Sequence, residues 1–207
     1  MLKAVIFDMD GVLVDSEGFY MRRRAGFLRE KGMPVPDPAR LVGADGRQVW
    51  ALMAPGAAPE ALDALMAEYD RYCLSHPIAY DTLANPQVKP LFRALRQRGL
   101  AIGIASSSPR DMVELMLRQL ALSPLVDAYV TGSDCALRKP DPEVYQKAMA
   151  RLGVTPARAV AVEDSTVGIR AARAAGLRVY ALRPYLPQDQ SEATAILEQL
   201  ADLPRFL

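Results

Sequence analysis

Short apolar runs alternate with longer amphipathic stretches over most of the chain. The first apolar run covers residues 4–7, and later runs are found at 100–105, 128–131, 159–162 and 177–182. Between them, apolar residues recur at helical spacing at 88–98, 110–120, 142–152 and 167–175. Strands that alternate with helices predict a parallel sheet joined by helical crossovers. The pattern therefore predicts an α/β fold with a doubly wound parallel sheet.

The pattern between residues 15 and 84 is different, because it shows helical spacing and no convincing strand. Helices are predicted at about 16–31, around 48–53 and at 60–75, with prolines between them. Ser16 can cap the first of these helices. We therefore expect a core domain of residues 1–14 and 85–207, with an α-helical cap domain of residues 15–84 inserted after its first strand.

Composition and charge exclude several classes of protein. The 207 residues are 51% hydrophobic and carry a formal net charge of +1, so nothing predicts binding to nucleic acid or to an anionic membrane. No apolar run approaches the roughly 20 residues that span a bilayer. The first strand is not preceded by a charged and apolar leader, and the two cysteines lack metal-binding spacing. We expect a cytoplasmic protein, and a monomer by default.

Two acidic residues follow the first predicted strand. Asp8 and Asp10 are separated by one residue and are followed by Gly11. Side chains at i and i+2 of an extended chain point to the same face, and a central parallel strand ends at the ligand crevice of its sheet. Two carboxylates there can hold a hard cation, or can divide into a nucleophile and an acid/base. The alternative is a strand that ends in a polar Asp-Gly turn.

Three further polar groups lie near the ends of later strands. Ser106 and Ser107 can donate to a phosphate beside a helix N-terminus, or can simply cap that helix. Lys139 stands in a proline-flanked turn, either as a fixed charge for a phosphate or as a solvated surface lysine. Glu163 and Asp164 end a buried strand, where a cation would offset the cost of their burial, although a helix cap is again the alternative. Together these groups fit phosphoryl transfer.

In this order and spacing, the four motifs resemble those of the haloacid dehalogenase superfamily, and the resemblance covers the whole chain. The inserted helices resemble the small α-helical cap of the subgroup that includes β-phosphoglucomutase and many sugar-phosphate phosphatases. The resemblance implies that Asp8 attacks phosphorus and becomes an aspartyl-phosphate. It also implies that Asp10 first protonates the leaving oxygen and then activates water.

The same resemblance implies a cofactor and a phosphate site. Mg²⁺ would be held by the Asp8 carboxylate, the backbone carbonyl of Asp10, Asp164 and, directly or through water, Glu163. The phosphate-binding candidates are Ser106, Lys139 and Ser107.

Substrate choice should lie in the cap, because the core handles only the phosphate. The candidates for contact with the leaving group are Tyr20, Arg23, Arg47 and Trp50. Trp50 also has helical spacing with Met53, which favours core packing. The mutase branch has a histidine near the position of Tyr20. It also has an arginine just after a glycine turn. In this chain the corresponding arginine, Arg47, follows the turn at 42–45 and is displaced by one position.

These departures favour hydrolysis over mutase chemistry. We expect a Mg²⁺-dependent phosphatase for small phosphomonoesters such as sugar or polyol phosphates, with a β-phosphoglucomutase-type mutase as the alternative. A signalling receiver that is phosphorylated on aspartate is a hypothesis from another class, but its acids cluster differently and it lacks a helical insertion. A non-catalytic protein of this fold is a further alternative. The expected partner is a small phosphorylated metabolite.

Overall fold

The computed structural model describes residues 1–41 and 46–207. Their contacts form two compact units, which are described separately. The core unit contains Met1–Ser16 and Ala79–Leu207, and the cap unit contains Glu17–Ile78. The predicted domain boundaries at residues 15 and 84 stay a prediction.

The core unit is built on a six-stranded sheet with the order β3-β2-β1-β4-β5-β6. All neighbouring strands are parallel. The strands are β1 (Ala4–Phe7), β2 (Ala101–Ala105), β3 (Ala128–Val130), β4 (Ala159–Glu163), β5 (Arg178–Leu182) and β6 (Ala195–Leu197). The predicted doubly wound α/β fold is confirmed. The short edge strand β6 was not predicted from the apolar pattern.

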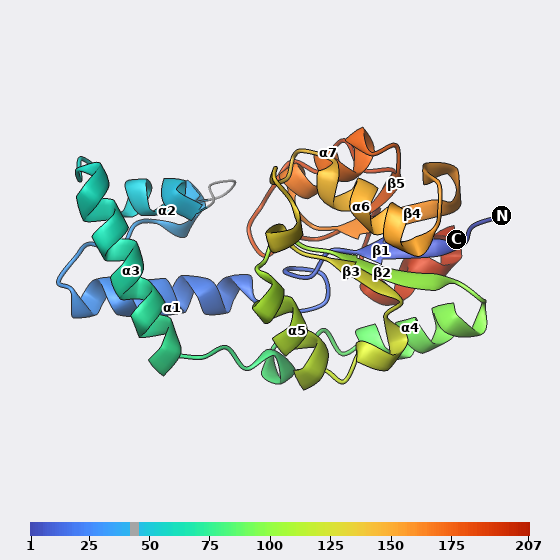
Figure 1. Ribbon diagram of the computed structural model, residues 1–207, viewed down its shortest axis with the longest axis horizontal. Coiled ribbons are helices and arrows are strands. Elements are labelled where there is room, and N and C mark those ends of the chain that lie inside the picture. The colour runs from blue at the N-terminus through green and yellow to red at the C-terminus, as the bar shows by residue number, and fades with distance from the viewer. Residues whose placement is uncertain (42–45) are drawn as a thin grey trace. The chain divides into compact units, whose positions relative to one another are not determined.

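Helices cover both faces of this sheet. They are α4 (Val88–Gln97), α5 (Arg110–Gln119), α6 (Glu143–Leu152) and α7 (Thr166–Ala174). Figure 1 shows α6 and α7 on one face and α4 and α5 on the other. The core unit also contains short 3₁₀ helices at Tyr80–Thr82, Ser123–Leu125, Gly132–Asp134, Pro156–Arg158 and Leu200–Phe206.

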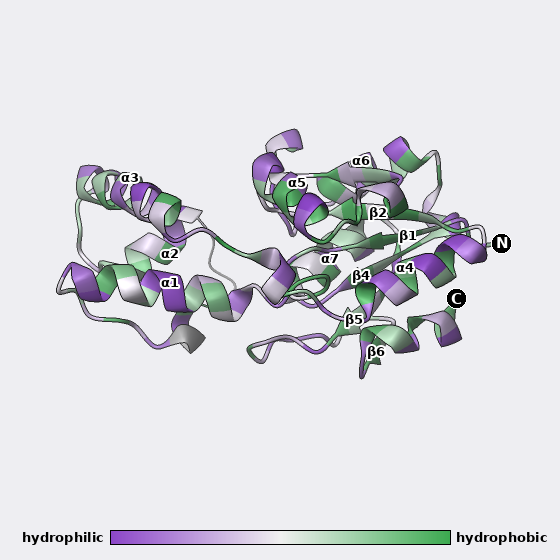
Figure 2. Ribbon diagram, turned by 90° about the horizontal axis from the view of Figure 1, so that it is seen from below, coloured by the Kyte–Doolittle hydropathy of each residue, from purple (hydrophilic) through white to green (hydrophobic). Residues whose placement is uncertain are grey.

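The middle of the sheet is apolar on both faces because helices cover both of them. All four residues of β1 are fully buried, and the green of β1 and β2 in Figure 2 marks their hydrophobic character. Phe7 packs against Phe92 of α4, with ring centroids 4.9 Å apart. On the other face, Ile6 belongs to a buried cluster with Tyr145 of α6. This packing fixes the carboxyl ends of the central strands.

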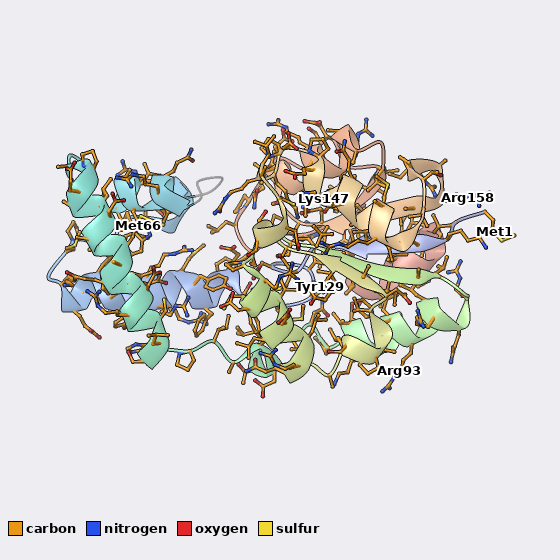
Figure 3. The ribbon with its side chains drawn as sticks, viewed as in Figure 1. Met1, Met66, Arg93, Tyr129, Lys147 and Arg158 are labelled. Carbon is orange, nitrogen blue, oxygen red and sulfur yellow. The ribbon has the colours of Figure 1, made fainter. Side chains whose placement is uncertain are left out.

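The cap unit has its own apolar core. Its helices are α1 (Glu17–Glu30), the 3₁₀ helix Pro38–Leu41, α2 (Gly46–Met53) and α3 (Pro59–Ser75). Trp50 is 6% exposed, and its ring lies 5.9 Å from that of Phe27 and 4.8 Å from that of Tyr69. Met66, labelled in Figure 3, is partly buried against the same cluster. Trp50 therefore packs in the core of the cap unit, as its helical spacing with Met53 indicates, and its role toward a substrate stays a prediction.

Trp50→Ala is expected to lower the free energy of unfolding of the cap unit by about 3–5 kcal/mol, because a large buried side chain leaves a cavity. Urea denaturation followed by circular dichroism measures this loss. Trp50→Phe should lose less, and Leu74→Ala is a control because Leu74 is 83% exposed. A Trp50→Ala protein as stable as the Leu74→Ala control would contradict the core assignment.

None of the helices in residues 1–41 and 46–207 is both long and apolar enough to cross a membrane.

Candidate active site

Three acidic side chains meet at the carboxyl ends of β1 and β4. Asp8 directly follows β1, and its backbone N–H donates to the carbonyl of Val162 at 2.9 Å. Glu163 is the last residue of β4, and Asp164 follows it. Asp8, Glu163 and Asp164 are all buried, and each offers one oxygen such that the three oxygens lie within 4.8 Å of one another. Parallel pairing thus brings together acids that are far apart in the sequence.

Lys139 links two of these acids. Its Nζ donates to Oδ1 of Asp8 and to Oε1 of Glu163, both at 2.6 Å, and to the carbonyl of Ala105 at 3.0 Å. The side chain is only 5% exposed. An ammonium has three N–H donors, so these three acceptors define one position for it. Lys139 is therefore a fixed internal charge and not a solvated surface lysine.

Glu163 is surrounded by donors. Its Oε1 accepts from Lys139 and, at 2.6 Å, from the hydroxyl of Tyr145. Its Oε2 accepts from the backbone N–H of Asp164 and from the hydroxyl of Ser165, both at 3.2 Å. The sequence pattern did not identify Tyr145. The sequence around a tyrosine near the start of a helix does not show which group its hydroxyl will bond.

Asp10 is held by two serines. The hydroxyl of Ser108 donates to its Oδ2 at 2.7 Å, and the hydroxyl of Ser16 donates to its Oδ1. Ser16 directly precedes α1, as a helix cap would, but its hydroxyl donates to Asp10. Ser106 is 1% exposed, and its Oγ accepts from the backbone N–H of Ser108 at 3.0 Å. Ser107 is exposed, and the hydrogen bonds described for this loop do not include its hydroxyl.

Carboxylates outnumber ammonium groups among Asp8, Glu163, Asp164 and Lys139. Three buried carboxylates and one ammonium leave two negative charges when all are ionised. Burial raises the pKa of Asp8 to about 8, against the effect of the Lys139 ammonium, which lowers it. Burial also works against the charge on Lys139, but the carboxylates of Asp8 and Glu163 raise its pKa above the ordinary value. A divalent cation would offset this charge, and carboxylate oxygens are suitable ligands for a hard cation.

Comparison with known proteins identifies the family of the chain. A family model described as haloacid dehalogenase-like hydrolase matches residues 2–176. The chain belongs to this family of hydrolases. The predicted resemblance and the prediction of an enzyme are thereby confirmed.

Similar proteins include named phosphatases. Validoxylamine A 7′-phosphate phosphatase of Streptomyces hygroscopicus is 30% identical over 98% of this chain and 96% of its own length. Phosphorylated carbohydrates phosphatase of Thermotoga maritima is 32% identical over 86% of this chain and 84% of its own length. The solved structure of β-phosphoglucomutase from Clostridium difficile has a TM-score of 0.79, covering 98% of this chain and 93% of that chain, and at 21% identity it shows the fold alone.

Two glycines of this hydrolase make room for the acids. Gly11 has φ +83°, and a Cβ built on it would lie 2.0 Å from Oδ2 of Asp164. A Cβ built on Gly168 of α7 would lie 2.1 Å from the carboxyl carbon and from both oxygens of Glu163. The carboxylates thus occupy space that any other residue at these positions would fill.

The main chain at Asp164 is tied to a later loop. Nε2 of Gln190 donates to the carbonyls of Asp164 and Leu182, both at 2.7 Å. Ser165 caps α7 by accepting from the backbone N–H of Gly168 at 3.1 Å. The cap of this helix is therefore Ser165, and Asp164 lies with the other acids. Gln190 is a supporting residue that the sequence pattern did not identify.

The remaining candidates lie in the cap unit of the hydrolase. Arg23 donates from Nε to the hydroxyl of Tyr69 at 3.1 Å, and its guanidinium lies 5.5 Å from the ring centroid of Tyr20. Arg47 forms an ion pair with Asp63 and donates to the carbonyl of Pro59 at 2.7 Å. The turn at 42–45 before Arg47 lies outside the described residues. The roles of Tyr20, Arg23 and Arg47 toward a substrate stay predictions.

Gly168→Ala is expected to force Glu163 out of its position and so leave Lys139 poorly paired. Breaking a buried ion pair costs about 3–5 kcal/mol, and urea denaturation should show a loss of this size. Gly99→Ala is the matched control, since Gly99 has φ +71° but open space around its Cβ, so only the smaller strain of about 1–2 kcal/mol is expected. Equal losses in the two variants would contradict the close approach at Gly168.

The affinity for a divalent cation is expected to rise with pH. The pKa of Asp8 is about 8 in the cation-free protein. At a pH below this value, Asp8 carries a proton that the cation must displace. One displaced proton gives about a tenfold gain in affinity per pH unit, which should level off above pH 8. Calorimetric titration with Mg²⁺ from pH 6 to 9 measures this dependence. An affinity that stays constant between pH 6 and 8 would show that Asp8 is already ionised.

Proposed function

We propose that this hydrolase is a Mg²⁺-dependent phosphatase for small phosphomonoesters, with sugar or polyol phosphates as the substrate class. The observation that carries the proposal is the contact between Oδ1 of Asp8 and Nζ of Lys139, at 2.6 Å, inside a buried group of acids. Two similar proteins are named as phosphatases of a validoxylamine phosphate and of phosphorylated carbohydrates. Their names support a phosphorylated carbohydrate or a related polyol as the substrate.

Asp8 is the proposed nucleophile. Its carboxylate attacks phosphorus, the bond to the leaving oxygen breaks, and an aspartyl-phosphate forms. A carboxylate that approaches a phosphate dianion is repelled by its charge. The Lys139 ammonium at the same oxygen reduces this repulsion, and it also stabilises the charge that spreads over the phosphoryl oxygens. Ser106, which is buried at the start of the loop after β2, is the proposed hydroxyl donor to the phosphoryl group.

Asp10 is the proposed acid and base. Both of its carboxylate oxygens accept from serine hydroxyls, at Ser16 and Ser108, which orients the side chain. It gives a proton to the leaving oxygen and then takes one from the water that cleaves the aspartyl-phosphate. Its environment must therefore differ from that of Asp8, which is paired with Lys139.

The acids fit a magnesium ion. Asp8, Glu163 and Asp164 each offer an oxygen within 4.8 Å of the others, and Gly11 leaves the space that Asp164 occupies. The proposed ligands are the carboxylates of Asp8 and Asp164 and the backbone carbonyl of Asp10, with Glu163 as a direct or water-bridged partner. A bound Mg²⁺ would supply positive charge to the phosphoryl oxygens.

Asp8→Asn is expected to reduce phosphate release to the background rate, because the amide is neutral and a much poorer nucleophile. Asp10→Asn should lower the rate by about 10²–10⁴-fold, the usual contribution of general acid–base catalysis. Release of inorganic phosphate measures both rates. Asp111→Asn, at an exposed position in the first turn of α5, is the control and should keep wild-type activity. Appreciable phosphate release by a pure Asp8→Asn preparation would contradict the assignment of Asp8 as the nucleophile.

A substrate panel tests the proposal directly. Phosphate release from sugar, polyol, nucleotide and amino-acid phosphates would be compared with and without Mg²⁺. We expect the highest kcat/KM for sugar or polyol phosphates and loss of activity when the cation is chelated. Interconversion of sugar phosphates that depends on a bisphosphate activator would instead favour the mutase alternative.

A further inference from the structure

Tyr145 is a buried polar residue that the proposed reaction does not use. It lies in the first turn of α6 and is fully buried. Its ring belongs to the apolar cluster between α6 and the sheet, together with Ile6 and Ala161. Its hydroxyl reaches Oε1 of Glu163 at 2.6 Å, which is short enough for a strong hydrogen bond to a charged group. A phenylalanine would pack equally well there, so the hydroxyl needs a separate explanation.

The hydroxyl shares an acceptor with the lysine of the site. Oε1 of Glu163 receives two donors, the Tyr145 hydroxyl and the Lys139 ammonium, both at 2.6 Å. Nζ of Lys139 also lies 5.1 Å from the centroid of the Tyr145 ring, so the tyrosine borders the ammonium on one side. Lys139 itself is divided between Glu163 and Asp8. The strength of its bond to Glu163 therefore affects how firmly it is held near Asp8.

When an oxygen accepts two hydrogen bonds, its attraction for each donor is weaker than when it accepts one. With the Tyr145 hydroxyl present, part of the charge on Oε1 is already engaged. Without it, Oε1 attracts Lys139 alone, and one restraint on the rotation of the Glu163 carboxylate is lost. The first change draws the ammonium toward Glu163 and away from Asp8, and the second leaves its position less well defined. The other oxygen of Glu163 is unaffected, because its donors are the backbone of Asp164 and the hydroxyl of Ser165.

We propose that Tyr145 is a positioning residue that holds Glu163 so that Lys139 stays shared with Asp8 and available to the phosphoryl group. This inference rests on the proposed function, because it assigns Lys139 to phosphate binding. The tyrosine acts through Glu163 and Lys139 on the phosphate. The hydroxyl donates its one hydrogen to Glu163, and the carboxylates of Asp8 and Asp164 would remain to hold the cation, so we expect cation binding to depend little on this hydroxyl.

Tyr145→Phe tests the inference, because it removes the hydroxyl and keeps the ring. The inhibition constant of inorganic phosphate and the KM of the best substrate should each rise about three- to tenfold, as expected for the loss of one hydrogen bond to a charged group. The half-saturating Mg²⁺ concentration should stay within about twofold of the wild type. A structural role alone would not separate phosphate binding from cation binding in this way.

Tyr180→Phe is the matched control. Tyr180 of β5 is buried at 3% exposure, and its hydroxyl donates to the carbonyl of Phe206 at 3.0 Å, so the variant also removes one buried hydroxyl. It should leave both the phosphate inhibition constant and the Mg²⁺ requirement at wild-type values. If Tyr145→Phe behaves like this control, or if it weakens phosphate and Mg²⁺ binding in parallel, the inference is overturned.

Calorimetry separates this result from a failure of the proposed function. Binding of Mg²⁺, and of inorganic phosphate in its presence, is measured on the wild type without any turnover. A wild-type protein that binds neither overturns the proposed function. A wild-type protein that binds both, with unchanged phosphate binding in Tyr145→Phe, overturns the positioning role alone.

Discussion

The site depends on one buried ammonium that is shared between two carboxylates. Lys139 donates to Asp8 and Glu163 at equal distances of 2.6 Å, and its third donor goes to the carbonyl of Ala105. Because its side chain is 5% exposed, solvent screens these contacts weakly. The lysine comes from a turn, whereas its partners come from β1, β2 and β4. This single charge therefore links the ends of three neighbouring strands to the connection between β3 and α6.

The folded chain tolerates this arrangement because the surrounding sheet is rigid and apolar. All residues of β1 and β4 are buried, so the acids at their ends have fixed main-chain positions. Burial of like charges is unfavourable, as the raised pKa of Asp8 indicates. Such unfavourable energy is common where a protein must hold a cation or a reactive carboxylate. The remaining packing of the core supplies the stability that the acids lack.

Much of this could be predicted from the sequence, for a physical reason. Buried parallel strands appear in the sequence as continuous apolar runs. Polar residues that follow these strands lie together, because the carboxyl ends of parallel strands share one edge of the sheet. The edge strand β6 was missed because its apolar run, Ala195–Leu197, has only three residues and does not stand out as a strand. Tyr145 and Ser108 were missed because the partner of a hydroxyl depends on packing between distant segments. The helical spacing of Trp50 with Met53 favoured core packing, and the structure places both residues in the apolar core of the cap unit.

The glycines beside the acids have a consequence for protein engineering. Gly11 and Gly168 each border a carboxylate so closely that even a methyl group would overlap with it. Attempts to redesign selectivity should therefore leave these positions unchanged. Redesign is better directed at exposed side chains of Glu17–Ile78, which forms a compact unit with an aromatic core of its own. One fold can host many functions, because function depends on the site that the fold carries and not on the fold itself.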